Sequence, residues 1–309
     1  MTDMWDGSVL CEFLGPDGLG YMDKPDKEGR LVFGLNMDGF NPYGNRQAGK
    51  KVSIGGIYMV CLNLPPVIHY KPKNVFLVGI IPGPHKPSVD EVNHLLRPLV
   101  DDLVVSWSPG IFLSQTPKYP AGQPVICALI PLICDLPSAC RVAGLGSHSS
   151  KFFCSECNLP VQDIDNLNTD DWPPRTREDH CTYSKTWRDA RSEAERSKLC
   201  EAHGIRWSEL LCLPYWDPTK FVVIDSMHGF YLRIFHRHIR DIWGMDISIE
   251  DGDPEGAYFS TMLSKGDIAK AQQVFHSGSL KLLQKLSTKT LKYLCYETGL
   301  HYGARRATL

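Results

Sequence analysis

Three aspartates follow apolar segments that have the length and composition of β-strands. The segments LVFGLN, VICALIPLIC and FVVI precede Asp38, Asp135 and Asp225. Carboxylates from neighbouring strand ends can hold two Mg²⁺ ions, because hard cations prefer oxygen ligands. Two such ions activate an attacking water or 3′ hydroxyl and stabilise the leaving oxygen, so the pattern predicts a catalytic magnesium site for phosphodiester chemistry. An aspartate after a strand is also ordinary turn or helix-cap chemistry, and this interpretation stays open.

A second group of candidate ligands is the pair Cys154 and Cys157 in a C-x-x-C spacing. Two thiolates at this spacing can bind one side of a tetrahedral Zn²⁺ ion, which needs two more nitrogen or sulfur ligands. The candidates for these are His180, His228, Cys181 and His148, of which we select His180 and His228. A redox dithiol and a pair of buried thiols are the alternatives, although a redox motif is expected to open a helix after a strand.

The elements that would position the aspartates alternate in a recognisable order. Apolar, β-branched runs predict strands, and Ser88 is a suitable cap for a following amphipathic helix that contains Pro98. We expect strands over residues 31–36, 53–64, 74–81, 125–134 and 221–224, a helix from Ser88 to about residue 104, helical structure over 178–203 and a helix over 227–243. The first three strands should form an antiparallel meander, and the strand over 125–134 should be central. The predicted class is therefore α/β, in the order β-β-β-α-β-insertion-β-α.

The predicted organisation has five parts. These are an N-terminal extension (1–30), the first part of the core (31–145), an insertion with the C-x-x-C pair (146–215), the last core strand and helix (216–246) and a helical tail (247–309).

Composition restricts the function classes. The chain has 309 residues, 43% of them apolar, and 33 Lys and Arg against 35 Asp and Glu, for a net charge of −2. No apolar run is long enough to span a bilayer, and the acidic N-terminus is unlike a secretory signal, so we expect an intracellular protein without membrane contact. Eleven cysteines are then thiols or metal ligands. Because a nucleic-acid-binding module is usually basic, contact with DNA would need a local patch or further sequence.

Longer motifs resemble a known family. The segments LNMDGFNPYGNRQAGKKVSIGGIYMVCLNLPP, LIPLICDLPSACRVAG, SHSSKFFCSECN and GIRWSELLCLPYWDPTKFVVIDSMH are similar to the Tnp2-type transposases of CACTA (En/Spm) elements, in the form common in basidiomycete fungi. The resemblance implies an RNase H-like core with an acidic DDE/D triad and two Mg²⁺ or Mn²⁺ ions, which cuts element ends and joins them to target DNA. It also implies a nuclear location and homo-oligomers.

The resemblance assigns roles to individual residues. Asp38 corresponds to the first catalytic acid, Asp135 to the second, and Cys154 and Cys157 to a C-x-x-C that follows the second acid. His228 belongs to a recurring Met-His pair. Asp225 is our choice for the third acid, whereas relatives can carry it beyond that pair. The similarity begins in the interior of a longer protein, so a fragment, a decayed copy or a truncated gene product is expected.

Three interpretations remain open on the sequence. The first is a metal-dependent DNA transposase, the second is a catalytically inactive remnant that binds DNA or protein, and the third is an unrelated zinc-containing scaffold.

Overall fold

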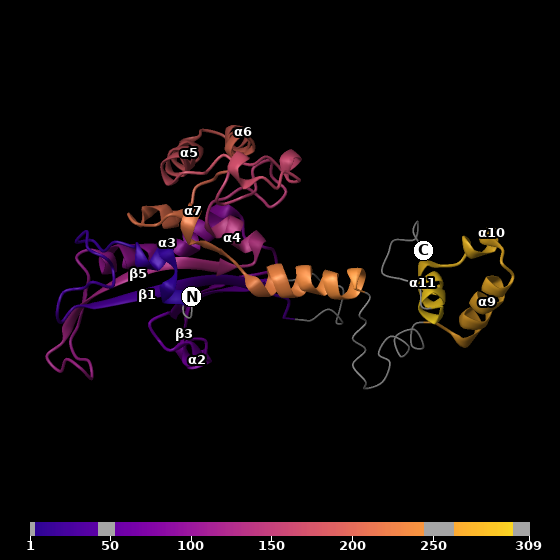
Figure 1. Cartoon of the computed structure of the whole chain (residues 1–309), viewed down its shortest axis with the longest axis horizontal. Coiled ribbons are helices and arrows are strands. Elements are labelled where there is room, and N and C mark those ends of the chain that lie inside the picture. The colour runs from indigo at the N-terminus through magenta and orange to yellow at the C-terminus, as the bar shows by residue number, and fades with distance from the viewer. Residues whose placement is uncertain (1–3, 43–52, 244–262, 299–309) are drawn as a thin grey trace. The chain divides into compact units, whose positions relative to one another are not determined.

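The computed structural model describes residues 4–42, 53–243 and 263–298. Contacts divide the chain into two compact units, Met1–His236 and Arg237–Leu309. Within the described residues, the first unit contains one mixed sheet with helices packed on it (Figure 1). The predicted mixed α/β class is therefore confirmed.

Six strands form this sheet in the part of the chain that the structure describes. They are β1 (Gly29–Phe40), β2 (Ile54–Cys61), β3 (Val75–Ile81), β4 (Ile111–Leu113), β5 (Gln123–Cys134) and β6 (Val222–Ile224). Their order is β3-β2-β1-β5-β4, and β6 also pairs with β5. The first three strands form the predicted antiparallel meander, whereas β5 runs parallel to both β1 and β6. The short edge strand β4 had no clear signal in the sequence.

The end of β1 differs from the prediction. The sequence placed the end of this strand at Asn36, but the strand continues to Phe40, with Asp38 opposite Gly56 and Gly39 opposite Gly55. The glycines of β2 permit this close pairing, since a Cβ atom on Gly55 would lie 3.1 Å from the carbonyl oxygen of Asp38. Asp38 therefore sits within the last residues of the strand and not in the following loop.

Helices of the first unit connect these strands. The longer ones are α3 (Val89–Trp107), α4 (Leu136–Val142), α5 (Arg177–Asp189), α6 (Glu193–His203) and the π-helical segment η6 (Met227–Phe235). The short ones are η1 (Met4–Asp6), α1 (Ser8–Cys11), α2 (Pro66–His69), η2 (Pro72–Asn74), η3 (Val161–Asp163), η4 (Thr169–Asp171), η5 (Glu209–Cys212) and α7 (Pro218–Phe221). Ser88 caps α3 as predicted, through a reciprocal capping box with Glu91, and Pro98 lies inside this helix.

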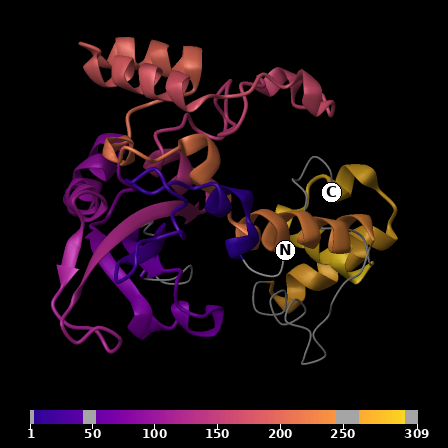
Figure 2. The same ribbon diagram turned by 60° about the vertical axis from the view of Figure 1, so that its left-hand side comes forward.

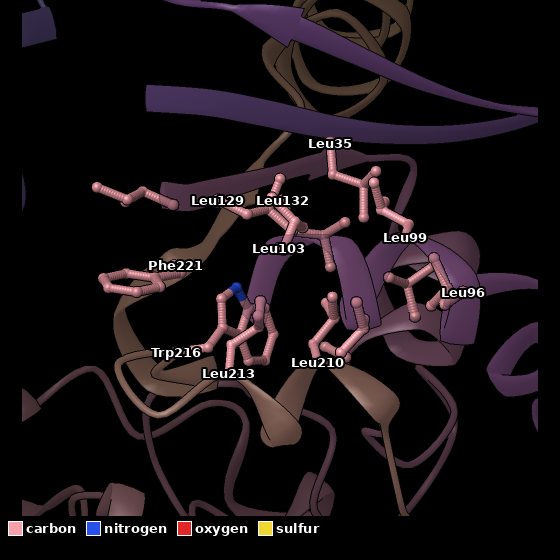
Figure 3. Packing of buried hydrophobic residues seen from close by; sticks show 14 of the residues in the cluster. Leu35, Leu96, Leu99, Leu103, Leu129, Leu132, Leu210, Leu213, Trp216 and Phe221 are labelled. Carbon is pink, nitrogen blue, oxygen red and sulfur yellow. The ribbon is translucent and has the colours of Figure 1, made fainter. Parts of the chain in front are cut away.

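The core lies between the sheet and the helices on one of its faces. Figure 3 shows leucines of α3 between leucines of β1 and β5 on one side and the segment that leads back to the sheet on the other. The labelled residues are Leu35, Leu96, Leu99, Leu103, Leu129, Leu132, Leu210, Leu213, Trp216 and Phe221. This face of the sheet also carries α4 and α7, and α5 and α6 lie beyond them (Figures 1 and 2). The chain between β5 and β6 thus contributes α4, α7 and the segment with Leu210, Leu213 and Trp216 to the core, and its helices α5 and α6 lie outside this layer.

Helical structure over residues 178–203 was predicted, and the structure has two helices there. The first, α5, ends at Asp189, and Ser192 caps α6 by accepting a hydrogen bond from the Glu195 amide. Gly204 ends α6 with a φ of +65°. A serine followed three residues later by a glutamate is the local signal for this second helix start.

The second unit has a small core of its own. It contains η7 (His238–Ile242), α9 (Lys265–His276), α10 (Leu280–Leu283) and α11 (Thr288–Glu297). Its buried cluster consists of Ala271, Leu286, Leu291, Tyr293 and Leu294. None of the helices in the described ranges has the length and apolar character that crossing a bilayer would require.

Candidate active site

Parallel pairing places the three predicted acids at equivalent positions of adjacent strands. Leu35 of β1 pairs with Leu132 of β5, and Asp38 and Asp135 each follow three residues later. Cys134 of β5 pairs with Ile224 of β6, and Asp135 and Asp225 are the next residues. Because adjacent strands lie about 4.8 Å apart, these positions share one edge of the sheet.

A backbone amide fixes one oxygen of each carboxylate. Asp135 caps α4, with its Oδ1 accepting a hydrogen bond from the Ser138 amide at 2.8 Å. The Oδ1 atom of Asp225 accepts from the Met227 amide at 2.9 Å, and that of Asp38 from the Gly39 amide at 2.7 Å. Turn or cap chemistry, the ordinary role of aspartate after a strand, is therefore present at Asp135 and Asp225, whereas Asp38 makes its amide contact within β1. The second carboxylate oxygen of Asp225 contacts the His228 ring.

The charges of the three carboxylates act on the same two neighbouring groups, His228 and Cys134. The pKa of the His228 imidazole is raised by its hydrogen bond to Asp225 and further by the charges of Asp135 and Asp38. Burial raises the pKa of the Cys134 thiol to about 12, and the same three carboxylates add to this effect. The pKa values of His228 and Cys134 are thus both raised by all three aspartates, which indicates that negative charge is concentrated at this edge of the sheet.

A pocket joins two of the acids. Asp38 and Asp135 both line it, together with Ser53, Ser138 and Arg141. Asp225 is not among its lining residues and instead forms an ion pair with His228 beside it. The structure therefore brings Asp38 and Asp135 to one cavity and Asp225 to the adjacent strand end.

The donor atoms at this edge fit a hard divalent cation, since carboxylate oxygens are the ligands that Mg²⁺ prefers. As the side chains stand, however, no three His, Cys, Asp or Glu residues of the described ranges are close enough together to hold a metal ion. An ion bound between these carboxylates would require their side chains to rotate.

The C-x-x-C pair forms a tight turn in the layer outside the core. The Glu156 amide donates a hydrogen bond to the Cys154 sulfur at 3.4 Å, and the Leu159 amide donates one to the sulfur of Cys157. The two thiols also interact with each other. Burial raises the pKa of the Cys157 thiol, and the Leu159 amide opposes this in part. As the side chains stand in the described ranges, Cys154, Cys157 and His180 do not form a group that could hold a metal ion.

His180 and Arg175 are buried near this turn. His180 is fully buried, and neither of its ring nitrogens has a hydrogen-bond partner among the described residues. Burial, together with the charge of Arg175, lowers the pKa of His180 to about 3, so its ring is neutral and has a lone pair to offer. Arg175 is 4% exposed and interacts with both Cys154 and Cys157. One arginine is therefore the common neighbour of three predicted zinc ligands.

The fourth predicted zinc ligand has a different environment. His228 contacts Asp225 at the carboxylate edge, and its electrostatic neighbours are the three aspartates. The charged groups that act on Cys157 are Cys154 and Arg175. The sequence did not single out Arg141 or Arg175, since only the tertiary fold brings them to the pocket and to the thiols.

The model of a family described as Transposase family tnp2 matches residues 22–191, which is more than half of the chain. The matched segment contains Asp38, Asp135 and the C-x-x-C pair, whereas Asp225 and His228 follow it. No curated protein matches the chain.

Proposed function

Because the chain belongs to the tnp2 family of transposases, we propose that it carries out metal-dependent DNA strand cleavage and strand transfer. The observation that carries this proposal is the register of β1, β5 and β6, which puts Asp38, Asp135 and Asp225 at equivalent positions of adjacent parallel strands. Three carboxylates so placed suit two Mg²⁺ or Mn²⁺ ions, which would supply an activated nucleophile and stabilise the leaving oxygen.

We assign separate tasks to the three acids. Asp135 would be the most rigid ligand, because its hydrogen bond to the Ser138 amide anchors it to α4. Asp38 would approach the same ions from across the shared pocket. Asp225, held by His228, would complete the triad from the neighbouring strand. In this proposal the sheet and the helix α3 are the RNase H-like core, and the chain between β5 and β6 is its insertion.

The proposed substrate is DNA in the form of transposon ends and a target duplex. On the motifs of its sequence, we propose that the chain acts on CACTA elements of the basidiomycete type, which would place its action in the nucleus. Pairing two element ends would further require a homo-oligomer.

DNA that carries the terminal repeats of a matching element tests the function. With Mg²⁺, the proposal expects strand cleavage at the repeat ends. Binding of the repeats without cleavage, in Mg²⁺ and in Mn²⁺, would contradict the catalytic proposal and favour the inactive remnant. If the chain neither binds nor cleaves the repeats, the catalytic proposal and the DNA-binding remnant are both contradicted.

For the insertion we propose a structural Zn²⁺ ion held by Cys154, Cys157 and His180. The amide-bonded thiols and the unpartnered, neutral imidazole support this ligand set. The ion would link the C-x-x-C turn to α5, which carries His180. We do not include His228 in this ligand set. Because it forms an ion pair with Asp225, we propose that it orients this carboxylate instead.

Zinc content gives a direct test of this ligand set. Cys154→Ser combined with Cys157→Ser is expected to remove about one zinc ion per chain, since two of the three proposed protein ligands are lost. A matched pair, Cys11→Ser with Cys61→Ser, should keep the full content, and so should His228→Asn. The measurement is metal analysis of the purified protein. Unchanged stoichiometry in the Cys154 and Cys157 variant would show that this turn does not bind zinc.

A further inference from the structure

The pocket that contains Asp38 and Asp135 is not purely acidic. Arg141 of α4 lines it from one side, and His85 and Lys86, which precede α3, line it from another. A cavity with two carboxylates and adjacent cations suits a ligand that is itself anionic and is bridged to the acids by metal ions. A phosphodiester has this character.

Arg141 is held in place beside the second acid. Its Nη2 atom donates a hydrogen bond to the Ser138 hydroxyl at 3.3 Å, and the Ser138 amide in turn donates to the Asp135 carboxylate. Ser138 is itself buried, at 4% exposed. The guanidinium and the proposed metal ligand are therefore positioned by the same residue.

The guanidinium of Arg141 also has donors to spare. Its Nε atom is buried and has no hydrogen-bond partner among the described residues. That atom is enclosed by protein, so a ligand in the pocket would be bound by the Nη donors that the hydrogen bond to Ser138 does not use. The planar guanidinium presents pairs of donors that match two phosphate oxygens.

From this geometry we propose that Arg141 binds a backbone phosphate of the DNA in the pocket and so positions the strand against Asp38 and Asp135. Lys86 lines the same pocket and adds positive charge there. Arg141 is thus a substrate-binding residue, whereas the carboxylates hold the ions. The inference rests on the proposed function, because it takes DNA as the substrate.

The test measures DNA binding without divalent metal, so that cleavage plays no part in it. The affinity of the full chain for a short mixed-sequence duplex is measured at several salt concentrations, for wild type, Arg141→Gln and Arg141→Lys. Arg141→Gln should bind about tenfold more weakly, because a charge-assisted hydrogen bond is lost. Its plot of log affinity against log salt should be shallower by about one phosphate contact. Arg141→Lys should restore the slope, since it keeps the charge, but only part of the affinity.

Lys151→Gln is the matched control, because Lys151 lies over the Phe152 ring in the insertion and does not line the pocket. Arg141→Gln with the affinity and salt slope of this control would overturn the inference, as would a wild-type chain that does not bind the duplex at low salt. Inorganic phosphate, added at constant ionic strength, serves as a competitor for the phosphate-binding position in the pocket. Competition that weakens wild type but not Arg141→Gln supports the pocket contact, and equal weakening of both overturns it. If Asp135→Asn, which removes the charge of the second acid, loses DNA cleavage while Arg141→Gln binds DNA normally, only this inference fails.

Discussion

Asp135→Asn is expected to reduce the rate of Mg²⁺-dependent DNA cleavage by about a thousandfold or more, while the protein stays folded. Asparagine keeps the oxygen that caps α4 through the Ser138 amide, so the helix start should persist. It removes the negative charge that a divalent ion needs from its ligand, and stabilisation of charge in the transition state is lost with the ion. The measurement is a single-turnover cleavage rate, with thermal unfolding as a check of the fold.

An aspartate elsewhere on the surface provides the control. Asp101 is exposed on α3, and Asp101→Asn removes the same charge without changing the carboxylate edge. It should cleave DNA at the wild-type rate. If Asp135→Asn and Asp101→Asn retain equal activity, Asp135 does not hold a catalytic ion.

Trp216→Ala is expected to lower the free energy of unfolding of the first unit by about 3 to 5 kcal/mol. Trp216 is fully buried and contacts Phe221 with a ring separation of 6.3 Å and an interplanar angle of 77°. It anchors the segment that returns from the insertion to the sheet, so its loss leaves a large cavity beside α3 (Figure 3). Urea unfolding followed by far-ultraviolet circular dichroism measures the effect.

A second substitution separates packing from hydrogen bonding at the same position. The indole Nε1 of Trp216 is buried and has no hydrogen-bond partner in the described part of the chain. Trp216→Phe removes this unsatisfied donor and keeps most of the apolar volume, so its cost should be below about 2 kcal/mol. Trp243→Ala, which changes a tryptophan that is 64% exposed, should have little effect. A loss below about 1 kcal/mol for Trp216→Ala would show that the return segment is not part of the core.

The parts of the fold that the sequence predicted are those with a strong local signal. The apolar run before Asp135 predicted β5, and Ser88 followed by Glu91 marked the start of α3. The sequence missed β4, which is only three residues long and depends on its pairing with β5. It also ended β1 too early, because the extension to Phe40 depends on the glycines of β2 across the ladder. Local patterns do not contain such long-range information.

The candidate site shows the same limit. Aspartates after apolar runs could be recognised one at a time, and parallel pairing then explains why they share an edge. The pairing of His228 with Asp225 spans only three residues, yet the C-x-x-C pair made a zinc role for this histidine equally reasonable. The positions of Arg141 and Arg175 depend on how α4 and the insertion pack, and no spacing in the sequence indicates them.

Cleavage of the polypeptide by a bound iron ion tests the central claim, which is that three aspartates far apart in the sequence meet at one ion site. Fe²⁺ bound in place of Mg²⁺ generates hydroxyl radicals with peroxide and ascorbate, and these cut the polypeptide near the ion. We expect cuts close to Asp38, Asp135 and Asp225, all suppressed by excess Mg²⁺ and all lost together in Asp135→Asn. Cuts near only one of these residues, or cuts that persist unchanged in Asp135→Asn, would contradict a shared site.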